Sequence, residues 1–288
     1  MDATRFLIIG AAGQLGLALG ERFPDAIKTD RGELDITDWE SVKNFDWSRV
    51  DVILNAAAYT NVDGAETPEG RKAAWQVNAT ATGYLAKIAS EHNITLVHVS
   101  TDYVFDGTAA PHTETEAFSP LGVYAQSKAA GDIAASVAPK YYVLRTSWVI
   151  GEGNNFVRTM IGLAAKNVSP TVVSDQIGRL TFTVQLVDAV EHLLKIQAEY
   201  GTYNVSNGGD PASWADITRT IFSELGRTDL TVTDTTTAEY FKSKPGGAAP
   251  RPLQSALDLS KIQATGLSLS DWRTDLHSYI ISETKKEQ

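Results

Sequence analysis

Short apolar runs alternate with amphipathic stretches through the first half of the chain. The runs lie at 6–9, 52–54, 94–99 and 141–144. They are rich in Val, Ile, Leu or aromatic residues and bounded by polar or small residues, which is typical of parallel strands covered on both faces. Helical patterns occupy the stretches at 14–23, 38–45, 68–92 and 121–138. This alternation predicts an α/β fold with a Rossmann-like, doubly wound parallel sheet.

The second half of the chain has a less regular pattern. The expected elements are helices at 155–165, 182–198 and 214–225, a strand at 202–205, a Pro- and Gly-rich loop at 238–252, and a frayed tail at 282–288. Ser213 and Gly226 supply an N-cap and a stop signal for one of these helices. We expect a cofactor-binding Rossmann domain at 1–150 and a smaller mixed α/β substrate-binding domain at 151–288, with pieces of 171–206 returning to the main sheet.

A glycine-rich turn follows the first apolar run. Gly10, Gly13 and Gly16 have the spacing G-x-x-G-x-x-G and open a predicted helix. In that context glycines allow a tight turn and let backbone N–H groups approach a pyrophosphate. Asp30 and Arg31 follow about twenty residues later. The acid would bond ribose hydroxyls and favours NAD, whereas the Arg would hold a 2′-phosphate and favours NADP, so both cofactors remain open.

Tyr124 and Lys128 form a Y-x-x-x-K pair on a predicted helix. Residues four apart share one helical face, so an ammonium can lie near a phenol. A nearby cation favours phenolate and lowers the pKa of the phenol, which would make Tyr124 a usable proton donor at neutral pH.

Composition narrows the possible functions. The chain has 288 residues, a formal net charge of −10 and no cysteine. The missing cysteines exclude disulfides, thiolate-ligated metals and a cysteine nucleophile, and the five His lack ligand spacing. We therefore predict no metal site. The acidic balance opposes nucleic-acid binding, and no apolar run is long enough to span a membrane, so we expect a cytoplasmic protein.

These motifs belong to longer strings that carry a resemblance. The chain resembles the extended short-chain dehydrogenases/reductases and, within them, the dTDP-4-dehydrorhamnose reductase family. The most specific strings are Ser-Thr-Asp-Tyr-Val-Phe at 100–105 and Arg-Thr-Ser-Trp-Val at 145–149. The other matching stretches are 10–16, 34–38, 55–66, 106–107, 120–128, 155–157, 175–178 and 251–252. They span nearly the whole chain.

The resemblance implies a reductase that uses NADPH or NADH to reduce the C4 keto group of dTDP-4-dehydro-L-rhamnose, giving dTDP-L-rhamnose. It assigns Thr101, Tyr124 and Lys128 as the catalytic triad. It implies a cofactor side made of Gly10, Gly13, Gln14, Leu15, Gly16, Asp30, Arg31, Asp35, Ile36, Ala57, Ala58 and Tyr59, with Tyr124 and Lys128. It implies a nucleotide-sugar side made of Thr101, Asp102, Tyr103, Trp148, Asn155, Phe156, Gln176 and Arg251.

Departures from the family pattern leave alternatives open. Ala18 stands where some members carry a Glu that binds a metal between subunits, so we expect a monomer or weak homodimer. Gln254 replaces a frequent Asn. The chain could be another epimerase or dehydratase of the superfamily. Dehydratases, however, have Thr-Asp-Glu at the triad threonine, whereas here Thr101-Asp102 is followed by Tyr103, which lacks the second carboxylate for water elimination. It could also be a regulatory module similar to the methionine adenosyltransferase regulatory subunit, or a reductase module that is fused to an epimerase in nature.

Overall fold

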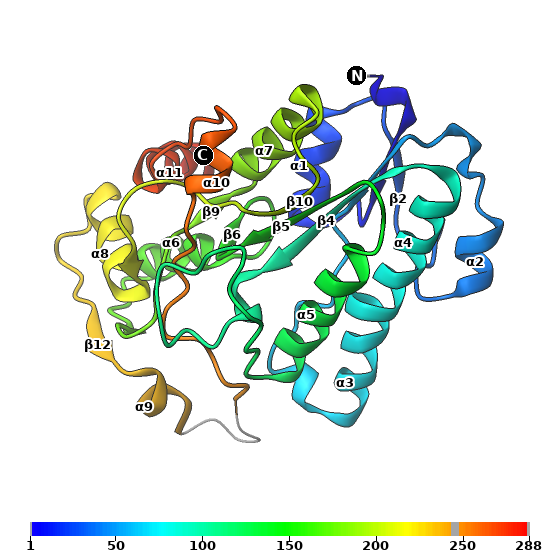
Figure 1. Cartoon of the computed structure of the whole chain (residues 1–288). Coiled ribbons are helices and arrows are strands. Elements are labelled where there is room, and N and C mark those ends of the chain that lie inside the picture. The colour runs from blue at the N-terminus through cyan, green and yellow to red at the C-terminus, as the bar shows by residue number, and fades with distance from the viewer. Residues whose placement is uncertain (1, 243–247, 287–288) are drawn as a thin grey trace.

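A six-stranded parallel sheet forms the centre of the computed structural model, which describes residues 2–242 and 248–286 (Figure 1). Its strands are β1 (Phe6–Ile9), β2 (Ile27–Thr29), β3 (Val52–Asn55), β4 (Thr95–Thr101), β5 (Tyr141–Thr146) and β10 (Gly201–Asn204). Their order is β2-β1-β3-β4-β5-β10, and every neighbouring pair is parallel. The predicted α/β fold with a parallel sheet is confirmed.

Helices cover both faces of this sheet. One face carries α1 (Gln14–Arg22) and α7 (Thr183–Ile196). The other carries α2 (Trp39–Asn44), α4 (Ala81–His92) and α5 (Val123–Ala135). Alternate residues of one strand enter opposite cores, as Leu7 and Ile8 of β1 do. This two-sided burial explains the unbroken apolar runs at Phe6–Ile9 of β1 and 52–54 of β3.

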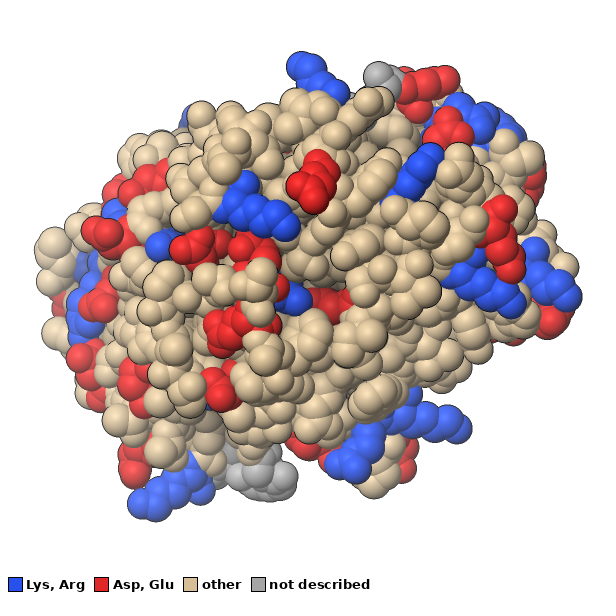
Figure 2. Space-filling view, viewed as in Figure 1, with Lys and Arg blue, Asp and Glu red and all other residues tan. Residues whose placement is uncertain are grey.

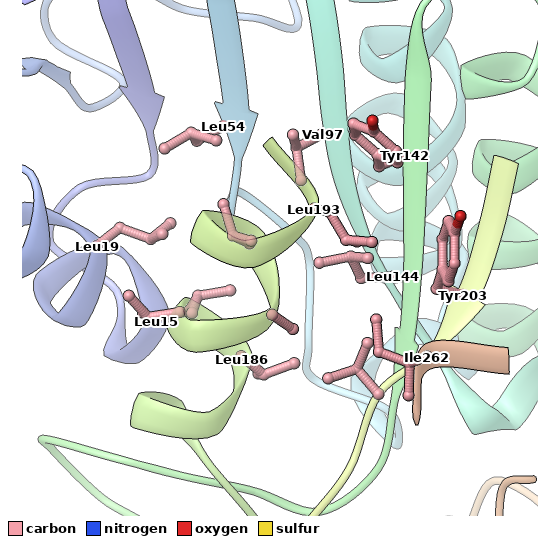
Figure 3. Packing of buried hydrophobic residues seen from close by; sticks show 14 of the residues in the cluster. Leu15, Leu19, Leu54, Val97, Tyr142, Leu144, Leu186, Leu193, Tyr203 and Ile262 are labelled. Carbon is pink, nitrogen blue, oxygen red and sulfur yellow. The ribbon is translucent and has the colours of Figure 1, made fainter. Parts of the chain in front are cut away.

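The core on the α1 and α7 face shows how distant segments meet (Figure 3). Leu15 and Leu19 of α1 and Leu186 and Leu193 of α7 pack over the residues of the sheet.

Helix α3 (Pro68–Trp75) continues into α4 through a π-helical turn at Gln76–Thr80. The predicted helix 68–92 is therefore helical without a break.

A smaller layer packs beside the carboxyl end of the sheet. Its core joins α6 (Phe156–Ala165), α8 (Trp214–Glu224) and α11 (Trp272–Lys286). Three two-stranded sheets edge this layer: β6 (Val149–Ile150) with β9 (Thr181–Phe182), β7 (Thr171–Val173) with β12 (Thr233–Thr235), and β8 (Ile177–Gly178) with β11 (Ala212–Ser213). The predicted Ser213 cap is confirmed, because its hydroxyl and Asp216 form a reciprocal capping box.

Several predicted boundaries were wrong. The edge strand β2 escaped prediction because Ile27-Lys28-Thr29 has no apolar run of its own. Helix α9 (Thr237–Lys242) occupies the first residues of the predicted loop 238–252, of which 243–247 lie outside the described residues. The tail expected to fray continues α11 as far as Lys286, because Glu283 pairs with Arg158 of α6 and anchors that last turn. Neither the short helix α10 (Ser260–Ala264) nor α11 was predicted.

Candidate active site

Two cavities lie side by side at the carboxyl edge of the central sheet. One, of 280 Å³, lies over the ends of β1 and β2, and the other, of 470 Å³, lies over the ends of β4 and β5. Gly13, Ala56 and Ala58 line both. The order of the sheet reverses between β1 and β3, and such switch points are where doubly wound sheets bind ligands.

The glycine turn joins the two cavities. Gly10 has φ +79°, and a Cβ there would lie 2.9 Å from the backbone of Ala57. A Cβ at Gly16 would lie 2.1 Å from the carbonyl oxygen of Gly10. Helix α1 begins after Gly13 with no side-chain cap, which leaves backbone N–H groups for an anion. This bare, positively polarised helix end, reached from both cavities, fits the pyrophosphate of a dinucleotide.

Charged residues of both signs line the smaller cavity. The Asp30 carboxylate accepts a hydrogen bond from the Ala12 N–H at 3.1 Å. Arg31 Nε lies 3.1 Å from Asp35 Oδ2, and 83% of the Arg31 side chain is exposed. The hydroxyl of Thr37 holds the pKa of Asp35 below its ordinary value. Ile36, Ala57 and Ala58 complete the wall. The cavity therefore offers an acceptor for ribose hydroxyls and an exposed cation for a phosphate.

Thr101, Tyr124 and Lys128 come together in the larger cavity, from β4 and one face of α5. Lys128 is buried, and its Nζ donates to the backbone oxygen of Val99 at 2.7 Å. Burial lowers the pKa of Lys128 to about 8, and nearby Asp132 opposes this. The expected lowering of the Tyr124 pKa by Lys128 is not seen, because burial raises that pKa above its ordinary value.

Asp102 and Tyr103 lie beside the triad, in a 3-10 turn that follows β4. Thr101 Oγ1 donates to Asp102 Oδ1 at 3.0 Å and accepts from the Tyr103 N–H at 3.2 Å. The rings of Tyr103 and Tyr124 meet edge to face, with centroids 5.9 Å apart. Burial raises the pKa of Asp102 to about 6.

Buried polar pairs lie beneath the cavity, and sequence reasoning missed them. Asp132 of α5 accepts from Arg145 Nε of β5 at 2.9 Å. Asn55 Nδ2 lies 3.1 Å from His98 Nδ1. Burial lowers the pKa of His98 well below its ordinary value, with a further contribution from Lys128. The available signal was Asp132, one turn after Lys128 on a helix otherwise rich in Ala.

An aromatic stack separates the larger cavity from a third one. Trp148, with φ +46°, lines the larger cavity, and its ring stacks on Trp214 with centroids 3.8 Å apart. Trp214 lines the third cavity, of 330 Å³, with Phe156 and Gln176. Gln176 accepts from Trp214 Nε1 at 3.2 Å and donates to Thr237 Oγ1 at 3.0 Å. Trp148, Phe156 and Gln176 were predicted site residues, whereas Trp214 was not.

Some predicted site residues lie outside these cavity walls. Tyr59 bonds through its backbone to Asn78. Asn155 caps α6 and donates to Tyr279. Arg251 pairs with Asp63 at 2.7 Å. Burial raises the pKa of the Tyr103 phenol, and the charge of Arg251 opposes that increase. Among the residues that do line the larger cavity, Gln14 donates to the backbone of Asn154, and Leu15 also belongs to the core. Missed residues of that wall include Thr60, Val62, Ser100 and Thr146.

Charges on the molecular surface are mixed in sign. Figure 2 shows Lys and Arg interspersed with Asp and Glu on the face it presents. Over residues 2–242 and 248–286, no cluster of His, Asp and Glu could hold a metal ion. Across the same residues, every helix is too short or too polar to cross a bilayer.

The parallel sheet, the glycine turn at its switch point and the adjoining Tyr124 and Lys128 define the class of short-chain dehydrogenases/reductases. A family model described as the RmlD substrate-binding domain matches residues 4–284. This chain belongs to that family.

Relatives with established names agree over almost the full length. A dTDP-4-dehydrorhamnose reductase of Aggregatibacter actinomycetemcomitans is 41% identical, over 95% of this chain and 97% of that protein. The crystal structure of a dTDP-4-dehydrorhamnose reductase from Clostridium acetobutylicum has a TM-score of 0.90 at 36% identity, covering 97% of this chain and 99% of that one. A Bacillus anthracis dTDP-4-dehydrorhamnose reductase in complex with NADP has a TM-score of 0.88 at 35% identity, covering 96% and 99%.

Proposed function

We propose that this chain reduces the C4 keto group of dTDP-4-dehydro-L-rhamnose to dTDP-L-rhamnose with NADPH or NADH. The observation that carries the proposal is the single cavity that holds Thr101, Tyr124 and Lys128 and adjoins the N-terminus of α1. A keto-sugar reductase needs a proton donor next to a dinucleotide site, and this cavity supplies both.

Three side chains carry the proposed proton chemistry. A bound nicotinamide would supply the hydride. Tyr124 holds its proton firmly because burial disfavours phenolate, so it remains a neutral donor until an alkoxide forms beside it. Charged Lys128 stabilises the phenolate that this transfer leaves. Thr101 would orient the carbonyl oxygen indirectly, because its hydroxyl bonds Tyr124, the residue that would face that oxygen.

The remaining site residues divide between the two ligands. We propose that the smaller cavity takes the adenosine half of the cofactor, with Asp30, Arg31, Asp35, Ile36, Ala57 and Ala58 around it. Gln14 and Leu15 would flank the cofactor in the larger cavity, and Gly10, Gly13 and Gly16 would shape its phosphate turn. Tyr59 would shape the turn after β3 from behind, through its bonds to Asn78.

The sugar would lie against Tyr103 and Trp148, next to Asp102. The third cavity is lined mainly by apolar and aromatic side chains, which suits a planar base, and Phe156 and Gln176 would contact it. Asn155 and Arg251 would act indirectly, by holding α6 and Tyr103.

On this basis residues 1–150 form the cofactor domain and 151–288 the substrate domain, with β10 and α7 completing the main sheet layer. We further propose a cytoplasmic monomer or weak homodimer.

A direct assay tests the function. The purified protein is mixed with enzymatically prepared dTDP-4-dehydro-L-rhamnose and NADPH or NADH, and nicotinamide absorbance is followed. Consumption of the cofactor with formation of dTDP-L-rhamnose is expected. Tyr124→Phe should lower the rate about 100-fold or more while cofactor binding is kept. Absence of turnover with either cofactor, in protein that still binds both, would refute the proposal.

A further inference from the structure

Asp102 is an enclosed carboxyl at the carboxyl end of β4. The residue is 2% exposed. Its Oδ1 accepts the Thr101 hydroxyl at 3.0 Å, while Oδ2 is buried and accepts no well-formed hydrogen bond among the described residues, although the Ser255 hydroxyl is near enough to lower the pKa of the carboxyl. A buried carboxylate oxygen without a donor is costly, and that cost favours the neutral acid. The enclosure therefore makes this carboxyl easier to protonate than an exposed aspartate.

The groups around Asp102 act on it unequally. Burial is the largest influence and raises its pKa to about 6. The hydroxyls of Ser255 and Thr101, and the charge of His112 when protonated, oppose this increase. The phenols of Tyr103 and Tyr124 face the same carboxyl, and a charge on Asp102 raises the pKa of each. No fixed cation is among the main influences on Asp102, so its protonation is decided mainly by burial.

Thr101 connects this acid to the proposed donor. Its hydroxyl stabilises the phenolate of Tyr124 and so lowers the pKa of that group. A hydroxyl has one hydrogen and two lone pairs. Thr101 Oγ1 can therefore accept from both the Tyr103 N–H and a protonated Asp102 while donating its hydrogen toward Tyr124.

We propose that Asp102 supplies, through the Thr101 hydroxyl, the proton that replaces the one Tyr124 gives to the substrate oxygen. This inference rests on the proposed reductase function. As the O–H bond of Tyr124 breaks and the sugar O–H bond forms, the Thr101 hydrogen moves to Tyr124 and the Asp102 hydrogen moves to Thr101. Asp102 ends as a carboxylate and regains a proton from water after product leaves. The cofactor is oxidised, the keto carbon is reduced, and the proton comes from solvent.

The pH profile of Asp102→Asn tests the relay, because the amide keeps the shape and the Oδ1 acceptor but has no acidic proton. In the unmodified protein kcat should decline as pH rises through the Asp102 titration. In Asp102→Asn that decline should vanish, with kcat reduced about tenfold or more below it and KM for the sugar nucleotide little changed. Asp106→Asn is the matched control, because that carboxylate accepts from the backbone N–H and hydroxyl of Thr108 at an exposed position away from the cavity wall. It should behave as the unmodified protein.

Isotope measurements give a second readout that needs no variant. The rate in mixtures of H₂O and D₂O should depend on the deuterium fraction along a curve, because more than one proton moves, and Asp102→Asn should make the dependence linear. A linear dependence in the unmodified protein, or an unchanged pH profile in a folded Asp102→Asn, overturns the relay. If the unmodified protein fails to oxidise NADPH with the sugar nucleotide, the proposed function itself has failed.

Discussion

Lys128 Nζ donates a hydrogen bond of 2.7 Å to the backbone oxygen of Val99, two residues before Thr101. The contact ties α5 to β4, so the ammonium is held beside the cavity by the main chain of the strand that carries Thr101. One interaction thus sets the relative position of two members of the proposed triad.

Replacing Lys128 should therefore affect both rate and pH dependence. Lys128→Met is expected to lower kcat about 100-fold or more, because the phenolate of Tyr124 loses its counter-charge. The pKa of Lys128 is lowered to about 8, so kcat/KM of the unmodified protein should fall as pH rises past about 8 and the amine loses its proton. Lys128→Arg should move that fall to higher pH. A fall that stays at the same pH in Lys128→Arg would assign it to another group.

The buried pair of Asp132 and Arg145 should dominate the stability of this region. Their side chains are 2% and 5% exposed. Asp132→Asn leaves a buried guanidinium without its counter-ion and should reduce the free energy of unfolding by about 3–5 kcal/mol. The surface change Asp229→Asn, which removes the partner of Arg227, should leave the urea midpoint unchanged. Equal midpoints for the two variants would contradict this expectation.

Arg31 and Asp30 should control the choice of cofactor. Arg31→Ala is expected to raise KM for NADPH roughly tenfold, because a charge-assisted bond to the 2′-phosphate is lost, and to leave KM for NADH within about twofold. Asp30→Asn should shift the preference toward NADPH by removing a like charge. Arg49→Ala, an exposed change outside the cavity walls, serves as control. Parallel titrations of both cofactors decide the matter.

The stack of Trp148 on Trp214 should matter for the sugar nucleotide and not for the cofactor. Trp148→Phe weakens an aromatic contact and is expected to raise KM for the sugar nucleotide roughly three- to tenfold. The dissociation constant for NADPH, followed by fluorescence, should be unchanged. Trp75→Phe alters an exposed ring on α3 and should change neither quantity. A change in NADPH affinity alone would place Trp148 on the cofactor side.

Replacing Gly16 with alanine should reduce both the stability of the protein and its affinity for NADPH. A Cβ there lies 2.1 Å from the Gly10 carbonyl oxygen and 2.7 Å from Ala11 Cα, so the phosphate turn must move. Gly16→Ala should cost about 1–3 kcal/mol of stability and weaken NADPH binding. Gly162→Ala in α6 meets nothing within 4 Å and should stabilise by about 0.5–1 kcal/mol. Thermal unfolding with and without NADPH separates the two effects.

Local patterns were sufficient for the main sheet except its edge strand β2, and for most helices. Apolar runs mark β1, β3, β4 and β5, because both faces of these strands are buried. Such a run consists of consecutive residues, so it can be recognised in the sequence. The short edge strand β2 was missed because it is held by pairing with β1 rather than by its own composition. Helix α11 was not predicted, and its last turn was expected to fray because a polar tail gives no sign of the partner that holds Glu283.

The chain by itself determined the α/β class, the glycine turn, the Tyr124 and Lys128 spacing and the strings that mark the family, since each depends on residues close together in sequence. Only the tertiary structure decided which groups become buried together. The stack of Trp148 on Trp214, the pair of Asp132 with Arg145 and the enclosed carboxyl of Asp102 all arise from segments brought together by folding. Burial, which raises the pKa of Asp102 and Tyr124 and lowers that of Lys128, is a property of the packed site and not of any one segment.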